Sequence, residues 1–254
     1  MGIAAACAGC PVRDRAACAA LSSNEREELA AAGRIVELAR GETLFAAGDQ
    51  SDRCATLIEG ALKITSFDRE GTERVLALVH PAGFVGELFT PFSHHDVVAL
   101  TASRLCVFGK GAFEGALHRY PALAETLLRR ASADLYETRE LIGLMGRRNA
   151  GAKVAGLLLA FSRAASESPC HGAHSFDLPL SRGDMAGLLG LTIETVSRQL
   201  SAFERDGLIR KQGARGIVTH TGRMTAGDAT VQVLVLPTLI LLWAGAVATI
   251  AALT

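Results

Sequence analysis

The feature that most limits the fold of this chain is a long helical stretch between Pro121 and Asn149. Proline suits the first turn of a helix, where the N–H that it lacks would have no partner, and no proline or glycine follows until Gly143. Apolar or small residues recur at alternating gaps of three and four, which is the seam of a coiled coil. The predicted seam residues are Leu128, Ala131, Leu135, Thr138, Ile142 and Met145.

Two interpretations of this stretch are open at the level of sequence. It is either a helix that pairs with a second copy of the chain or an amphipathic helix packed on its own domain. The pairing interpretation is favoured because the stretch joins two regions of different character: a glycine-punctuated β pattern precedes it, and a helix-turn-helix pattern follows it. We therefore expect a dimerisation helix over residues 121–149.

Charge gives a local indication of a nucleic-acid partner. At 254 residues the chain is long enough for two domains with separate cores. Lys and Arg together number 26, as do Asp and Glu, so the overall charge indicates nothing about nucleic acid. Between Arg182 and Arg223, however, seven basic residues stand against four acidic ones, a net charge of +3.

Three cysteines near the N-terminus, Cys7, Cys10 and Cys18, have the spacing C-x2-C-x7-C. A C-x-x-C pair places two thiolates on one turn, where both can bind one metal centre. No cationic segment followed by an apolar one begins the chain, so we expect a cytoplasmic protein with free thiols. Thiolates suit an iron–sulfur cluster or zinc, and reactive or unliganded thiols are the alternative. The candidates for a fourth ligand are Cys54, Cys106 and Cys170.

From Gly33 to Phe108 short strands alternate with glycine turns, which predicts an antiparallel β-roll or jelly roll. We expect one hairpin around Glu59-Gly60 and another around Ala102–Arg104. His94-His95-Asp96 could bind a metal, but a polar loop before a strand is the favoured interpretation. No carboxylate pair, Ser/His/Asp set or phosphate-binding glycine loop occurs, so we do not expect an enzyme. The predicted strands are Glu42–Phe45, Ala55–Ile58, Ala61–Ser66, Val75–Val79, Val97–Leu100 and Leu105–Phe108.

Residues 180–209 form the most specific pattern in the chain, a helix-turn-helix. Ser181 and Asp184 make a capping box, Gly190 makes the turn and Thr192 caps the second helix. In the second helix one face carries Val196, Leu200 and Phe203 and is expected to be buried. The opposite face carries Glu194, Ser197 and Arg198, of which Arg198 can bind a guanine edge and Glu194 a cytosine amine. Strands at 208–211 and 216–219 predict a wing, with Lys211 and Arg215 available to phosphates.

The order of these parts resembles the Crp/Fnr superfamily of bacterial transcription regulators, in particular its oxygen-sensing Fnr branch (FnrL/FnrN-type). The resemblance covers residues 7–219 and rests on C-x2-C-x7-C, Arg40–Asp49 and Glu194–Arg198. It implies that Cys106, in the last β-roll strand, joins the three N-terminal cysteines to hold a [4Fe–4S] cluster. It also implies a homodimer on double-stranded DNA, at a palindrome like TTGAT-N4-ATCAA, with RNA polymerase as a further partner.

Three alternatives accompany this resemblance. A zinc- or thiol-based regulator of the same family could respond to another signal, and an iron–sulfur electron carrier is disfavoured by the winged helix-turn-helix. Relatives that bind cyclic nucleotides carry an Arg-Ser/Thr pair after Gly-Glu. Here Gly86-Glu87 is followed by His94-His95-Asp96 without an arginine, which argues against cAMP.

The predicted organisation ends in an apolar tail that the family does not have. Residues 231–254 contain no charge, and about 20 apolar residues span a membrane. A transmembrane anchor, a terminal helix packed on the protein and a tail left by an altered reading frame after about Gly216 are the alternatives. The predicted parts are a cysteine-rich segment (1–32), a β-roll sensor domain (33–120), the dimerisation helix (121–149), the winged helix-turn-helix (150–220) and this tail (231–254).

Overall fold

The computed structural model describes residues 3–4, 7, 9–164, 173, 175–212 and 216–219. Cys170, Arg215 and the apolar run at 231–254 lie outside these residues, and so do the predictions made for them. The chain forms two compact units. One is Met1–Leu157 with Pro179–Leu200, and the other is Leu158–Leu178 with Ser201–Thr254.

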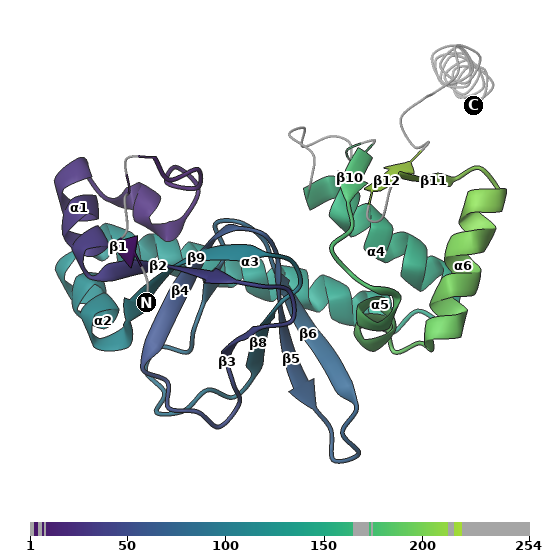
Figure 1. Cartoon of the computed structure of the whole chain (residues 1–254), viewed down its shortest axis with the longest axis horizontal. Coiled ribbons are helices and arrows are strands. Elements are labelled where there is room, and N and C mark those ends of the chain that lie inside the picture. The colour runs from purple at the N-terminus through teal and green to yellow at the C-terminus, as the bar shows by residue number, and fades with distance from the viewer. Residues whose placement is uncertain are drawn as a thin grey trace, which may run out of the picture. The chain divides into compact units, whose positions relative to one another are not determined.

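The first unit is built on two antiparallel β-sheets (Figure 1). One sheet has the strand order β1-β2-β9-β4-β7, and the other has the order β3-β8-β5-β6. Leu57, Leu62 and Leu105 are fully buried in the core that both sheets share, which confirms the predicted β-roll. The strands are β1 (Ile3–Ala4), β2 (Gly33–Leu38), β3 (Thr43–Phe45), β4 (Arg53–Glu59), β5 (Leu62–Phe67), β6 (Glu73–Val79), β7 (Phe84–Val85), β8 (Asp96–Ala99) and β9 (Ser103–Gly109).

Both hairpins predicted within the roll are wrong. β4 pairs with β7 and β9, whereas β5 pairs with β6 and β8, so the turn at Glu59-Gly60 carries the chain from one sheet to the other. β8 and β9 also lie in different sheets, so the turn at Ala102–Arg104 joins the two sheets and does not close a hairpin. Gly60 has a φ of +95°, and a Cβ there would lie 2.3 Å from Ser103 Oγ, so the crossing point has room only for glycine.

Helices gather at one end of the roll, with the N-terminal segment beside them (Figure 1). α1 (Ser23–Ala31) begins with a capping box of Ser22 and Glu25. It follows the short 3-10 helix η1 (Ala17–Ala20). α2 (Lys110–Arg119) has no counterpart among the predicted elements, because ten residues with two glycines show little periodicity.

The predicted long helix is confirmed as α3 (Pro121–Met145), with Pro121 in its first turn and Gly146 as its C-cap. One side of α3 packs on its own chain, since Leu123 and Leu144 are buried and Leu127 and Leu141 are half-buried. Among the described residues no helix is both long and apolar enough to cross a membrane.

The helix-turn-helix has the predicted form. After α4 (Ala150–Ala164) come α5 (Arg182–Leu189) and α6 (Ile193–Arg205), separated by Gly190 in the left-handed conformation. The second unit contains a three-stranded sheet, β10 (Ser175–Asp177), β12 (Gly216–Thr219) and β11 (Ile209–Gln212) in that order. β11 and β12 form the predicted wing. β10 was not among the predicted strands, because a strand of three residues is too short to show alternation.

Candidate metal centre and nucleic-acid interface

Three thiols of the N-terminal segment and one of β9 interact with one another: Cys7, Cys10, Cys18 and Cys106. Burial, followed by the charges of Cys7, Cys18 and Cys10, raises the pKa of Cys106 to about 12. Burial also raises the pKa of Cys18, and the neighbouring Cys7 and Cys10 raise it further. The structure therefore brings together the four cysteines that the family resemblance implies, although they are up to 99 residues apart (7 to 106).

The fold fixes Cys106 more firmly than the other three thiols. β9 lies in the middle of its sheet, where Cys106 is opposite Ile35 on β2 and opposite Thr56 on β4. A strand paired on both sides holds its side chains in place, so Cys106 is a fixed point to which the N-terminal segment is brought.

The N-terminal segment folds onto an apolar cluster at this point. Val12 and Ala16 are each 1% exposed and pack with Cys10, Cys18 and Cys106. The amides of Arg15 and Ala16 both donate to Val12 O, which closes a tight turn between Cys10 and Cys18. Two buried side chains and one turn thus anchor the loop that carries the second and third thiols.

Arg26 of α1 organises the chain after Cys18. Its Nε donates to Cys18 O at 3.3 Å and its Nη2 donates to Leu21 O at 2.9 Å. The Cys7 thiol contacts Arg26 O at 3.8 Å. The guanidinium charge lowers the pKa of Cys7 and Cys18 against the larger effect of burial, which raises it. Arg26 thus provides a positive charge close to Cys7 and Cys18, where it would stabilise thiolates.

Within the described residues no group of three or more His, Cys, Asp or Glu side chains is arranged to hold a single metal ion. Zinc would need its sulfur ligands about 2.3 Å from one point. Four thiolates on a cubane bind four different irons and are therefore spread more widely. All five described cysteines are free thiols, so the donors that a cluster requires are present.

Cys54 is a separate case. It is fully buried, and burial, then Glu114 and Cys106, raises its pKa to about 12. It lies opposite Phe108 in the β4–β9 pair and packs in the apolar cluster under α2 and α3. This placement is that of a small buried hydrophobe, although Cys54 was one of the three candidates for a fourth ligand.

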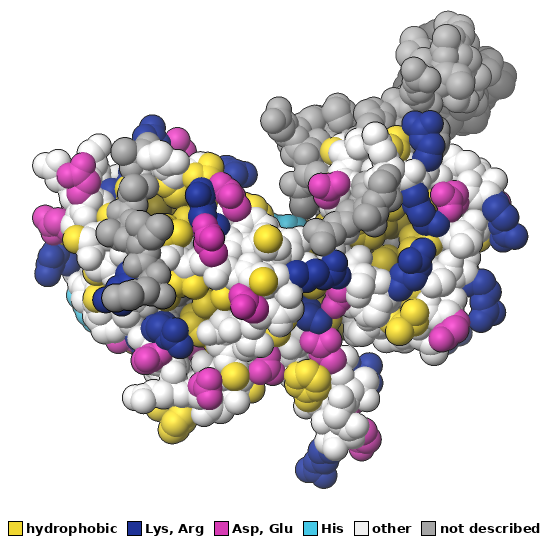
Figure 2. Space-filling view, viewed as in Figure 1, with side chains coloured by type: hydrophobic (Ala, Val, Ile, Leu, Met, Phe, Trp, Pro, Cys, Tyr) yellow, Lys and Arg dark blue, Asp and Glu magenta, His cyan; other side chains and the backbone are white. Residues whose placement is uncertain are grey.

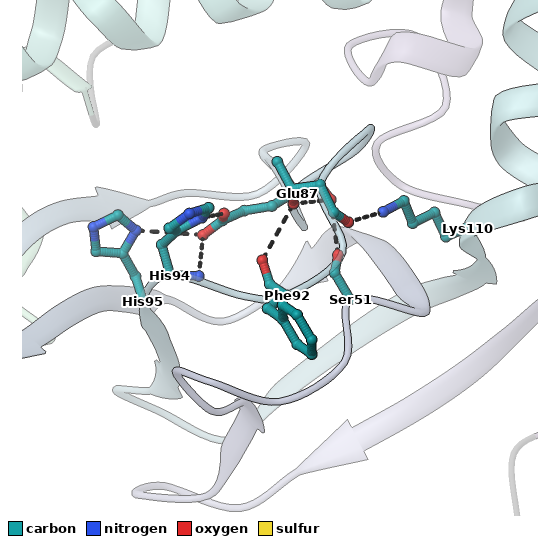
Figure 3. A network of polar contacts seen from close by, with 7 residues as sticks. Ser51, Glu87, Phe92, His94, His95 and Lys110 are labelled. Atoms are coloured by element: carbon teal, nitrogen blue, oxygen red, sulfur yellow. Dashed lines mark hydrogen bonds and ion pairs between the residues drawn. The ribbon is translucent and has the colours of Figure 1, made fainter.

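In the loop after Gly86, the Glu87 side chain is held by polar groups of the same loop (Figure 3). The Glu87 carboxylate accepts a hydrogen bond from His94 N at 2.9 Å and contacts Nδ1 of His94 and, at 3.3 Å, Nδ1 of His95. Ser51 Oγ donates to Glu87 O at 2.7 Å. Burial alone would raise the pKa of Glu87, but the hydrogen bonds from both histidines lower it overall. Glu87 is therefore an anion, which would repel a phosphate group placed beside it.

The exposed face of α6 carries the predicted base-reading residues. Glu194 and Arg198 are exposed and Ser197 is half-buried, while Val196 and Leu200 are buried on the opposite face. Thr192 Oγ1 accepts a hydrogen bond from Thr195 N at 3.2 Å and so caps the helix, as predicted. Figure 2 shows Lys and Arg side chains on the surface over α6 and β11.

Two residues near the DNA-reading face differ from expectation. Lys211, predicted to contact phosphates, is paired with Glu204, with 2.6 Å between Nζ and Oε2. Ile193 was not singled out, yet it is 51% exposed in the first turn of α6, where an apolar side chain can contact a thymine methyl group. An apolar residue beside a cap is the signal that could have identified it.

The predicted seam of α3 lies on its exposed side. Leu128 is 69% exposed, Leu135 is 49% exposed and Ile142 is 58% exposed. Met145 and Ala131 are exposed as well, and Thr138 is half-buried. α3 therefore has one apolar stripe packed on its own chain and a second, uncovered stripe next to it.

Comparison with known proteins gives matches over most of the chain. Residues 35–120 match the cyclic nucleotide-binding domain, and residues 152–222 match the Crp-like helix-turn-helix domain. The chain is 36% identical over 228 residues to the transcriptional activator protein FnrL of Cereibacter sphaeroides, which covers 87% of this chain and 92% of that protein. It is 28% identical over 218 residues to the anaerobic regulatory protein of Haemophilus influenzae, covering 84% and 83%.

Solved structures share the fold. The structure of FixK2 from Bradyrhizobium japonicum superposes with a TM-score of 0.67 at 24% identity, covering 74% of this chain and 92% of that one. At this identity the likeness shows the fold alone.

Proposed function

The chain belongs to the Crp/Fnr family of DNA-binding transcription regulators, and from this premise we propose that it senses oxygen through a [4Fe–4S] cluster held by Cys7, Cys10, Cys18 and Cys106. The observation that carries the proposal is the mutual interaction of these four thiols, three from the N-terminal segment and one from β9. Members of this family are transcription regulators and not enzymes.

A cluster bound by these residues would supply an oxygen-labile cross-link between the N-terminal segment and β9. The chain's own residues prepare for this link. Val12 and Ala16 anchor the loop, and Arg26 holds the backbone that follows Cys18. Four thiolates are the ligand set of a [4Fe–4S] cluster, which is the reason for preferring a cluster to a single zinc ion.

The DNA-binding form is a homodimer that pairs through the exposed stripe of α3. A stripe with three large apolar residues about half exposed or more is costly to leave in water. Two-fold symmetry then places two α6 helices about 34 Å apart, one turn of DNA. The half-sites would form a palindrome like TTGAT-N4-ATCAA, read by Glu194, Ser197 and Arg198, with RNA polymerase as a further partner of the bound dimer.

A cyclic nucleotide is not part of this proposal, although residues 35–120 match the cyclic nucleotide-binding domain. Glu87 is an anion held by His94 and His95, and no arginine that could bind a cyclic phosphate lies between Gly86 and Val98. Regulation of DNA binding places the protein in the cytoplasm. The apolar tail at 231–254 lies outside the described residues, and its insertion in a membrane remains a prediction.

Purification without oxygen tests the proposal. We expect about four irons and four sulfides per chain, no zinc, and DNA binding that is lost on exposure to air. One zinc per chain with no sulfide would contradict the cluster and favour a zinc-stabilised regulator with another signal. Protein without any metal that binds DNA equally with and without air would contradict both.

A further inference from the structure

Arg130 connects α3 to the loop between Cys10 and Cys18. Its Nη1 donates a hydrogen bond to Arg15 O at 2.8 Å, across 115 residues of sequence. α3 also packs against η1, which follows this loop and contains Cys18. Arg130 is half-buried, unlike its neighbour Arg129, which is exposed. A charged side chain of α3 therefore contacts the segment that carries the thiols.

The loop presents this carbonyl to Arg130 in a fixed position. Arg15 lies between Val12 and Ala16, each 1% exposed, in the turn whose amides donate to Val12 O. The same two apolar residues pack with Cys10, Cys18 and Cys106. Any rearrangement of the thiol loop would therefore move Arg15 O and break the hydrogen bond from Arg130.

The hydrogen bond to Arg15 O uses only part of the Arg130 guanidinium. Its Nε is buried and has no hydrogen-bond partner in the described structure. Asp134, one turn further along α3, and Glu137, two turns along, form no ion pair with any described residue. Burial raises the pKa of both carboxyls, and the charge of Arg130 opposes that rise. An i,i+4 pair between Arg130 and Asp134 is thus a second arrangement within reach.

We propose that Arg130 is the positioning residue through which the loop between Cys10 and Cys18 sets the dimer face of α3. The inference rests on the proposed function, since the state of the thiols is its input. With the loop closed, Arg130 binds Arg15 O and fixes the part of α3 that carries Ala131 and Leu135. With the loop open, Arg130 turns to Asp134, and this part of the seam loses its anchor.

Arginine suits this role better than lysine. Its planar guanidinium presents five donors, so one nitrogen can bind a backbone carbonyl while others face a carboxylate. Lysine would keep the charge but offer a single nitrogen on a different path. Arg130→Lys should therefore behave between the wild type and Arg130→Met, which keeps a long apolar stem without donors.

The first measurement is amide hydrogen exchange of residues 12–20 in protein purified without oxygen. Removing a hydrogen bond from a charged donor should speed local opening by about tenfold or more. We expect this in Arg130→Met and not in the matched control Arg129→Met, whose exposed guanidinium pairs with Glu125 on the same helix. Exchange that is equal in the two variants would show that Arg130 does not hold the loop.

The second measurement is the dimer dissociation constant by analytical ultracentrifugation, before and after exposure to air, with iron and sulfide measured in each sample. Arg130→Met should retain the wild-type cluster content, yet its dissociation constant should change on exposure about tenfold less than that of the wild type. An undiminished change would overturn the coupling even if loop exchange is faster. If Arg130→Met does not fold, Arg130→Lys replaces it, with a smaller loss expected.

The two proposals fail in distinguishable ways. Wild-type protein without iron and sulfide would overturn the proposed function, and with it the coupling to cluster state. A loaded wild type whose response to air is unchanged by Arg130→Met would overturn only the role of Arg130.

Discussion

Two cysteines lie in the paired strands β4 and β9, but only one of them interacts with the N-terminal thiols. Cys106 is coupled to Cys7, Cys18 and Cys10, whereas Cys54 is coupled to Cys106 and Glu114. Spacing alone left both cysteines, and Cys170, as candidates for a fourth ligand. Which cysteine can be the fourth ligand depends on which end of β9 the N-terminal segment packs against. This packing joins residues far apart in the sequence, so spacing alone cannot predict it.

Substitution of these two cysteines tests the assignment. Cys106→Ser should lose the iron and sulfide of protein isolated without oxygen, because three thiolates remain to hold a four-iron cluster. Cys54→Ala, the matched control in the paired strand, should keep the full content, since it removes only a buried sulfur. Iron and sulfide analysis distinguishes the two variants. Full content in Cys106→Ser would transfer the fourth position to another residue.

At the DNA-binding face, a change at a residue that reads bases should affect binding differently from a change beside a residue that contacts phosphates. Arg198→Ala should cost about 1–3 kcal/mol at one base pair of each half-site, because it removes a bidentate contact with guanine. Glu204→Gln should instead strengthen binding to all sequences alike, since it releases Lys211 from an ion pair of 2.6 Å. Binding measured against half-site variants separates the effects. Uniform weakening by Arg198→Ala would mean that α6 does not read bases.

At the scale of elements, α3 is the part whose role depends on a second copy of the chain. Thr138→Asp would place two like charges against each other across the two-fold axis, so dimerisation should weaken by at least about tenfold. Ala133→Asp, a matched change at an exposed position outside the seam, should have little effect. Ultracentrifugation without oxygen measures both. Equal association of the two variants would show that the seam is not the interface.

Three charged side chains link the hairpin β5–β6 to helix α5. They are Lys63 on β5, Glu73 on β6 and Asp184 on α5. Lys63 Nζ lies 2.8 Å from Glu73 Oε1 and 2.8 Å from Asp184 Oδ1, and the side chains of Lys63 and Asp184 are 10% and 11% exposed. Asp184 also caps α5 through Ser181. Burial would raise the pKa of Asp184, but Lys63 and Ser181 lower it overall. Burial would lower the pKa of Lys63, but its two partners raise it overall.

Lys63→Met should therefore destabilise the protein by about 3 kcal/mol, because it leaves a buried carboxylate without its cation. The depressed pKa of Asp184 means that this stabilisation is present above its ordinary value of 3.8 and is lost as pH falls through the lower, folded value. The difference between wild type and variant should thus persist at neutral pH and shrink in acid. Arg74→Met, which breaks an exposed pair on β6, should change stability by less than about 0.5 kcal/mol. Denaturant unfolding at several pH values measures these differences, and equal effects of the two variants would contradict the stabilising role of the three charged side chains.

Helices with a periodic pattern or cap residues of their own could be predicted from the sequence, whereas the pairing of the strands could not. Pro121, Ser181 and Gly190 mark helix boundaries by local chemistry, and the structure has them in those roles. The turn at Gly60 looks like that of a hairpin, but the chain crosses there between sheets. A hairpin and a crossing between sheets both place a glycine with positive φ between two short apolar strands. Only the packing of the whole roll determines which of the two forms.

At the scale of the whole molecule, the site depends on segments that are distant in sequence. The thiols join the N-terminal segment to β9, and Arg130 joins that segment to α3. The sequence indicated each part, since each has its own motif. It did not indicate the contact of Arg130 with Arg15 O, because a charged residue on a helix flank is usually solvated.

The dimer as a whole fixes the distance between its two reading helices, and the spacing of the DNA half-sites tests this. Two-fold symmetry requires half-sites about one helical turn apart, so that both α6 helices enter the major groove on one side of the duplex. Inserting five base pairs rotates one half-site by about half a turn and turns its groove away. Affinity should then fall by at least about a hundredfold, toward that of a single half-site. Altering the sequence of the four-base spacer without changing its length is the control and should preserve binding. If affinity survives the insertion, the two recognition helices are not held in one rigid dimer.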